Sequence, residues 1–266
     1  MKTSLLFFVS LFLVVHAAHA QIRTGTIIVF ELAKDKFAIA ADSRAIFSDR
    51  PPEDNHCKIA AFKSNDVIFA AGNATGYPNR GIADFMPSWD VVDEARRAVD
   101  AERVIKRTNA TDAANGIVSL WENNMLARWT QMMLYHPEDV RYIAAKNEGH
   151  LTHGVFAVAR AGSIAIALTS IVDDNGKLRA ERAPVKCPVG EICATGKLEI
   201  FNKYITAGKK FMVTDPPLSR VIKLVELTIA EDKSGTVHGP IDAVELLNDG
   251  TIQWRHKKSN CPENSD

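Results

Sequence analysis

The chain has 266 residues, of which 46% are hydrophobic, and its 32 basic residues balance 32 acidic ones. This balance excludes a whole-protein field that would attract nucleic acid, so we expect no nucleic-acid partner. The length is enough for one well-cored domain and does not demand a second.

The N-terminus has the features of a secretory signal peptide. Lys2 is followed by an apolar run over residues 5–15 and then by residues 18–20 (Ala-His-Ala), the order that signal peptidase reads. Because a membrane-spanning helix takes about 20 apolar residues, an uncleaved anchor is the less favoured alternative. We therefore expect a secreted or periplasmic protein without a membrane anchor, with a signal peptide over residues 1–20 and one domain over residues 21–266.

Two pairs of apolar strands are predicted next. Residues 26–30 and 37–41 are rich in β-branched and small apolar residues, and a polar turn separates them. Residues 58–62 and 67–71 repeat this arrangement. Their near-continuous apolar character indicates strands that are covered on both faces.

The middle and C-terminal parts alternate between helical and strand patterns. Residues 91–106 and 113–134 are predicted helices, and in the second Trp and Met recur every three or four positions, which favours a packing face over a cofactor site. Further strands are expected over residues 154–160, 163–172, 177–183, 241–247 and 251–255, and further helices over 197–207 and 218–231. This order fits an α+β protein with two antiparallel sheets stacked between helical layers.

The cysteines are even in number, as expected of an exported chain with disulfides. They are Cys57, Cys187, Cys193 and Cys261. Cys187 and Cys193 could close a short loop, but three pairings are open from the sequence. No Cys or His has the spacing of a zinc site, so we expect no metal and no cofactor. The basic run over residues 255–258 is interpreted as a solvated strand end.

Three segments of the N-terminal part form a pattern with defined spacing. They are residues 24–29 (Thr-Gly-Thr-Ile-Ile-Val), 40–44 (Ala-Ala-Asp-Ser-Arg) and 58–72, which starts with Lys and ends with Phe-Ala-Ala-Gly. Sixteen residues separate the aspartate from the lysine, and fourteen separate the lysine from the final glycine. Segments and intervals resemble those of proteasome β-type subunits, which are N-terminal-nucleophile hydrolases. The resemblance is firm over residues 24–76 and architectural beyond them.

This resemblance implies a four-layer αββα sandwich and the site of a threonine-type peptidase. Thr24 would be the nucleophile and its own α-amine the base, because the pKa of an α-amine, about 7.7–8, lies near the working pH. Lys58 would stabilise the alkoxide, and Asp42 would orient Lys58. Gly72 would let its backbone N–H approach the developing oxyanion.

Two further family elements have weaker counterparts. Residues 194–196 (Ala-Thr-Gly) resemble a Gly-Ser-Gly turn, in which Thr195 would supply a supporting hydroxyl. The family's second acidic element, an Asp three residues before a Ser, has no clean match, because Asp232 lies two residues and Glu231 three residues before Ser234. We therefore carry over Thr195 but neither acid.

The residues before Thr24 leave the function open. Arg23 stands where the family has glycine, and signal cleavage would leave residues 21–23 ahead of Thr24, whose nitrogen would then be an amide. Either a second cut after Arg23 frees an endopeptidase that acts on peptide or amide substrates, or the chain starts at Gln21 as a non-catalytic scaffold or binding protein. A third reading is an amidase for a small non-peptide amide. A homo-oligomer is compatible with each reading.

Overall fold

The computed structural model describes residues 26–46, 51–78, 86–183, 187–206, 215–259, 261 and 263–264. Thr24 and the predicted signal peptide lie outside these described residues. Within them, no helix is long and apolar enough to cross a membrane.

The first sheet has five antiparallel strands in the order β10-β1-β2-β11-β12. Their bounds are Ile192–Gly196 (β10), Ile27–Leu32 (β1), Lys36–Ala41 (β2), Asp242–Leu247 (β11) and Ile252–His256 (β12). Helices α4 (Glu199–Thr206) and α5 (Pro217–Glu231) cover its outer face. The continuous apolar pattern of the N-terminal strands is thereby explained, because side chains on both faces of β1 and β2 are buried.

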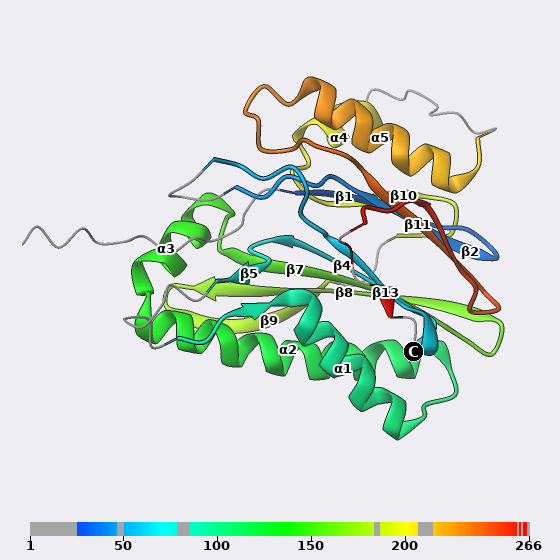
Figure 1. Cartoon of the computed structure of the whole chain (residues 1–266), viewed down its shortest axis with the longest axis horizontal. Helices are drawn as coiled ribbons and strands as arrows, with labels where there is room; N and C mark the ends of the chain where they lie inside the picture. The colour runs from blue at the N-terminus through cyan, green and yellow to red at the C-terminus, as the bar shows by residue number, and fades with distance from the viewer. Residues whose placement is uncertain are drawn as a thin grey trace, which may run out of the picture.

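The second sheet has six strands in the order β13-β3-β4-β7-β8-β9, antiparallel except for β13, which runs parallel to β3. Their bounds are Glu263–Asn264 (β13), Ile59–Phe62 (β3), Val67–Asn73 (β4), His150–Arg160 (β7), Ser163–Asp174 (β8) and Lys177–Ala183 (β9). On its outer side lie α1 (Val91–Ile105) and α2 (Ala110–Tyr135), while α3 (Pro137–Lys146) packs against α2 and β7 at one end of the layers (Figure 1). A short 3₁₀ turn, η1 (Lys63–Asn65), and a two-stranded ribbon of β5 (Gly76–Tyr77) and β6 (Trp89–Asp90) complete the described elements.

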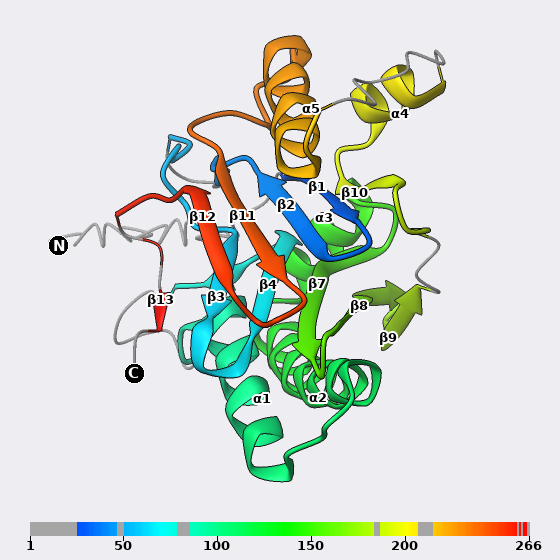
Figure 2. The ribbon, with the colours of Figure 1, turned by 90° about the vertical axis from the view of Figure 1, so that its right-hand side faces the viewer.

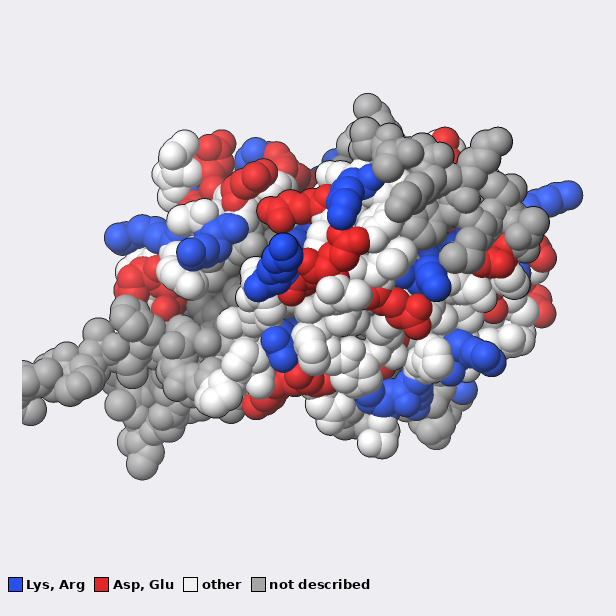
Figure 3. All heavy atoms as spheres, turned by 90° about the horizontal axis from the view of Figure 1, so that it is seen from above, with Lys and Arg blue, Asp and Glu red and all other residues white. Residues whose placement is uncertain are grey.

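The layers follow in the order helices, sheet, sheet, helices (Figure 1 and Figure 2). One apolar cluster, which includes Ile28, Ile68 and Val155, fills the space between the inner faces of the two sheets. Separate clusters join each sheet to its own helices. The predicted four-layer αββα sandwich is therefore confirmed. On the face that carries α5, described acidic and basic side chains are interspersed (Figure 3).

Helix α2 buries the predicted Trp and Met stripe against the second sheet. Trp121, Met125, Trp129 and Met132 are fully buried. A Cβ on Gly154 of β7 would lie 3.0 Å from the Trp121 ring, so glycine is what lets the indole lie against the strand. The interpretation as a packing face is confirmed.

Besides η1 and the two-residue strands β5, β6 and β13, helix α3 and strand β10 differ from the sequence-based predictions. Helix α3 was not predicted, although Pro137 at its first turn followed by Glu138 and Asp139 is a recognisable start signal. Thr195 was expected in a turn but belongs to strand β10, because residues 192–196 pair with β1.

The four cysteines form two disulfides. Cys187 and Cys193 close the short loop that the sequence suggested, with Cα atoms 5.9 Å apart. Cys57 pairs with Cys261 at a Cα distance of 5.3 Å and so fastens the C-terminal segment to the start of β3. Disulfides are typical of proteins that fold in an oxidising compartment.

Candidate active site

Asp42 and Lys58 form a buried ion pair between the two sheets. Asp42 follows the last residue of β2, Lys58 precedes the first residue of β3, and Lys58 Nζ lies 2.7 Å from Asp42 Oδ1. The side chain of Lys58 is 1% exposed and that of Asp42 is 0% exposed. Such complete burial is rare for lysine. Burial lowers the pKa of Lys58, and the charge and hydrogen bond of Asp42 oppose this shift. The pair that the resemblance implied is therefore present in the structure.

Backbone N–H groups hold the Asp42 carboxylate in place. Its Oδ1 also accepts from the N–H of Ile27, at 2.9 Å, and so fixes the start of β1. Its Oδ2 accepts from the N–H of Arg44, at 3.1 Å, a local bond that favours a turn where β2 ends. A second bond to Oδ2, from the N–H of His238 at 3.3 Å, reaches the segment before β11. One carboxylate thus ties together β1, β2 and the approach to β11.

Arg44 lies beside this ion pair and bonds two loops. Its Nη2 lies 2.8 Å from Asp54 Oδ2, and its Nη1 donates to the carbonyl of Gly235 at 2.8 Å. The hydrogen bond from Arg44 lowers the pKa of Asp54. The predicted Asp-Ser-Arg segment is therefore more than a solvent-exposed turn, because it joins two loops distant in sequence.

Small residues surround the start of β1. A Cβ on Gly72 of β4 would lie 3.4 Å from Thr26 Cγ2, so Gly72 and Thr26 face each other between the sheets. Gly196 of β10 has φ +96°, and a Cβ there would lie 2.2 Å from the Thr26 carbonyl oxygen. This glycine lets β10 approach closely enough for the N–H of Lys197 to donate to that oxygen at 2.9 Å.

The structure brings three of the five predicted site residues, Asp42, Lys58 and Gly72, around the start of β1. Thr195 pairs with Ile28 and therefore shares the inner face of the first sheet, one strand away. Thr24, the predicted nucleophile, lies outside the described residues.

Asp232, which we did not carry over from the family pattern, lies beside the end of β10. It accepts from Lys197 Nζ at 2.7 Å and from the N–H of Ser234 at 3.0 Å. Burial raises the pKa of Asp232, but hydrogen bonds from Lys197 and Ser234 outweigh burial and hold it well below its usual range. Glu231 instead bonds Lys203 and Tyr204 on the helical layer. The signal in the sequence was a pair of hydroxyl residues, Ser234 and Thr236, that closely follow Asp232 just after the end of a helix.

His153 is a further polar residue of this region that the sequence did not indicate. It pairs with Gly72 across β4 and β7, its Nδ1 lies 2.7 Å from Ser170 Oγ, and its ring centroid lies 4.9 Å from that of His150. Burial, with a smaller effect of His150, lowers the pKa of His153 to about 4. No local signal marks this residue, because its neighbours come from strand pairing.

One group among the described residues could hold a metal ion. The candidate ligand atoms of His136, Glu138 and Asp139 lie within 4.8 Å of one another. However, His136 Nε2 lies 2.8 Å from the Tyr77 hydroxyl, and acids in the first turn of α3 stabilise the helix without an ion. The group is explained by local structure.

No family model and no curated protein matches the sequence. Among solved structures, the chain is similar to a Gly-1 mutant of Anbu, a proteasome-like bacterial protein, from Hyphomicrobium sp. strain MC1. The superposition has a TM-score of 0.51 at 12% sequence identity, and it covers 89% of this chain and 88% of the Anbu chain. At this identity the likeness shows the fold alone, and the function has to be argued from the site. The chain therefore shares its αββα sandwich fold with this Anbu structure.

Proposed function

We propose that this protein is an exported threonine-type hydrolase of peptide or amide bonds, with Thr24 as its nucleophile once the bond after Arg23 is cut. The observation that carries the proposal is the buried Lys58–Asp42 pair, whose carboxylate also holds the N–H of Ile27. Ile27 is three residues beyond Thr24, and three residues of extended chain span at most about 11 Å. A charged lysine is thus kept next to the segment that would carry the nucleophile.

The chemistry of these groups fits acyl transfer. A threonine hydroxyl is a weak nucleophile until a base takes its proton, and a free α-amine can do so near neutral pH. The hydroxyl oxygen would then attack the carbonyl carbon while its proton moves to the amine. The Lys58 ammonium would stabilise the negative charge that develops on the threonine oxygen. This effect would be stronger between packed sheets than in water. Asp42 would hold Lys58 in position.

Both disulfides support export, since an oxidising compartment favours them. The same compartment would expose the Arg23–Thr24 bond to trypsin-like enzymes, which cut after arginine. The alternative is a non-catalytic binding protein that starts at Gln21, because its threonine would lack a free amine.

Intact mass and N-terminal sequencing of the mature protein, followed by labelling with a β-lactone that acylates nucleophilic hydroxyls, test the proposal. We expect a mature chain that starts at Thr24, labelling at that residue in wild type and Thr24→Ser, and no labelling in Thr24→Ala. A chain that starts at Gln21 and is not labelled would establish the binding-protein alternative. Turnover of fluorogenic peptides against small amides then separates a peptidase from an amidase.

A further inference from the structure

A second buried ion pair lies beside the first. Lys258 Nζ lies 2.5 Å from Asp242 Oδ2, and the Lys258 N–H donates to Asp242 Oδ1 at 3.3 Å. The side chains are 8% and 0% exposed. The interpretation of residues 255–258 as a solvated strand end is therefore wrong for Lys258. Its side chain turns inward because a buried carboxylate at the start of β11 needs a partner.

Lys258 contacts both segments that carry the first pair. Its ammonium donates to the carbonyl oxygen of His56 at 2.7 Å and to Ser43 Oγ. Ser43 directly follows Asp42, and His56 lies two residues before Lys58. One side chain thus joins the end of β2, the approach to β3 and the start of β11.

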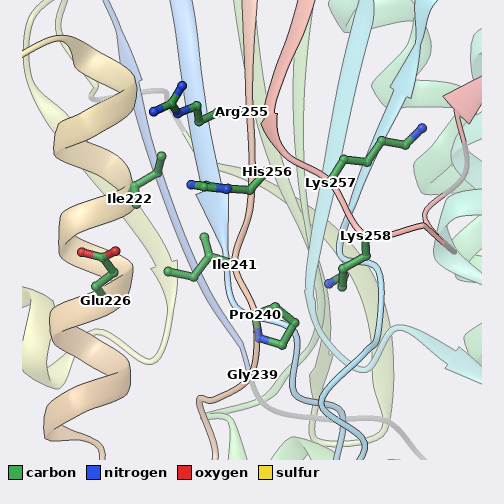
Figure 4. Close-up of a pocket in the computed structure, with 9 residues that line it drawn as sticks. All are labelled: Ile222, Glu226, Gly239, Pro240, Ile241, Arg255, His256, Lys257 and Lys258. Carbon is green, nitrogen blue, oxygen red and sulfur yellow. The ribbon is translucent and has the colours of Figure 1, made fainter.

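Lys258 belongs to the C-terminal segment that follows β12. After β12 the chain reaches Cys261, whose Sγ is 3.5 Å from Asp242 Oδ2 and whose disulfide joins Cys57, the neighbour of Lys58. Lys257 and Lys258 of this segment line a cleft of about 590 Å³ between α5 and β12. In the cleft, Lys257 and Lys258 extend in opposite directions (Figure 4).

The two pairs also influence each other electrostatically. The positive charge of Lys258 lowers the pKa of Lys58, while the negative charges of Asp42 and Asp242 raise it. Burial lowers the pKa of Lys258, and the negative charges of Asp242 and, to a smaller extent, Asp42 oppose this shift. Two acids and two bases therefore form one buried group with balanced charge.

We propose that Asp242 and Lys258 are positioning residues for the reaction at Thr24, because they lock together the segments that hold Asp42 and Lys58 and set the charge around Lys58. This inference rests on the proposed function of Thr24. A purely structural pair would stabilise the fold without changing the behaviour of Lys58.

The test compares Lys258→Met with Lys257→Met, a matched loss of one charge at the adjacent exposed position. One readout is the pH dependence of Thr24 acylation by a β-lactone; the other is the titration of Lys58 by NMR with ¹³C-labelled lysine. We expect Lys258→Met to slow acylation about tenfold or more and to move the Lys58 titration to higher pH, because a repelling charge is lost. Lys257→Met should change the acylation rate by no more than about twofold and the pKa of Lys58 by less than about one unit.

The double variant Asp242→Asn/Lys258→Met keeps the test valid if the single variant unfolds. It removes both charges, so no buried charge of this pair is left unpaired. We expect acylation to remain slow, since the contacts to Ser43 and His56 are lost, with a smaller change in the Lys58 titration. Wild-type acylation and an unchanged Lys58 titration in the folded variants would overturn the proposal. If wild-type Thr24 is not labelled at all, the proposed function fails, while the Lys58 titration still decides whether Lys258 controls the environment of Lys58.

Discussion

Lys58 is a charged side chain in an interior that ordinarily excludes charge, and Asp42 is what makes its burial tolerable. The two partners are not equivalent. Asp42 has three backbone N–H donors besides the lysine, from Ile27, Arg44 and His238. The carboxylate is therefore held from several sides.

Removing Asp42 should destabilise the protein more than removing Lys58. We expect Asp42→Ala to lower the free energy of unfolding by about 3 kcal/mol, because it leaves a buried ammonium without its carboxylate. Lys58→Met should cost roughly 1–2 kcal/mol, since the N–H donors still satisfy Asp42. Urea denaturation measures both. Lys36→Met, which breaks a half-exposed pair with Glu245, is the control and should cost under about 1 kcal/mol. Equal losses for Asp42 and Lys58 would contradict this account.

The partly buried His153 should make the fold sensitive to acid. Its pKa is about 4 in the folded protein and about 6.5 when unfolded, so the unfolded state binds the proton first as the pH falls. His153 should therefore contribute stability in full above pH 6.5 and lose about 3 kcal/mol of it between pH 6.5 and 4. Urea denaturation across this range should show a shallower loss in His153→Gln. Parallel pH profiles for the two proteins would refute the prediction.

At the scale of elements, the α2 stripe joins the outer helices to the second sheet. Trp121 lies over Gly154 and contacts Phe69 and Phe156, with ring centroids 5.8 Å from each. Large aromatic side chains contribute strongly to a core because they bury much apolar area. This contact fixes how α2 lies on the strand that follows it.

Trp121→Ala should lower the free energy of unfolding by about 3–5 kcal/mol, because it leaves a cavity against β7. The matched control on the same helix is Leu134→Ala, whose side chain is 71% exposed and whose loss should change stability by less than about 0.5 kcal/mol. Thermal unfolding followed by circular dichroism compares them. Similar melting temperatures for the two variants would show that the Trp121 indole does not stabilise the packing of α2 on β7.

At the scale of the whole molecule, the two disulfides constrain loops of very different length. Cys57 and Cys261 are separated by 204 positions, whereas Cys187 and Cys193 are separated by 6. Closing a longer loop removes more conformational entropy from the unfolded chain. The first disulfide therefore joins the start of β3 to the C-terminal segment, and the second acts locally.

Replacing Cys57 and Cys261 by Ser should cost about 5 kcal/mol, and replacing Cys187 and Cys193 by Ser about 2 kcal/mol, from loop-closure entropy. Urea denaturation of the two double variants measures the difference. Wild type in a reductant, which breaks both disulfides, should lose about as much stability as the two variants together, about 7 kcal/mol. A larger loss for the short loop would contradict the entropic account.

Much of the architecture could be read from the sequence, because strand and helix periodicity depend on residues close together in the chain. The first four strands and both long helices were predicted in this way. Helix α3 was missed although its start signal is local. Strand β10 was missed because only its pairing with β1 distinguishes it from a turn.

The sequence by itself determined the order of strands and helices. Its resemblance to proteasome β-type subunits, carried by motifs and intervals within one short segment, implied the sandwich layers and the pairing of Asp42 with Lys58. Only the tertiary structure decided the environment of that pair. Ser43 and Lys258 are 215 positions apart, and Asp42 and His238 are 196 apart. Such contacts form when β11 and the C-terminal segment dock against β2 and β3, and burial then requires each charge to find a partner. Docking also selected the disulfide pairs and placed Asp232, rather than Glu231, beside β10.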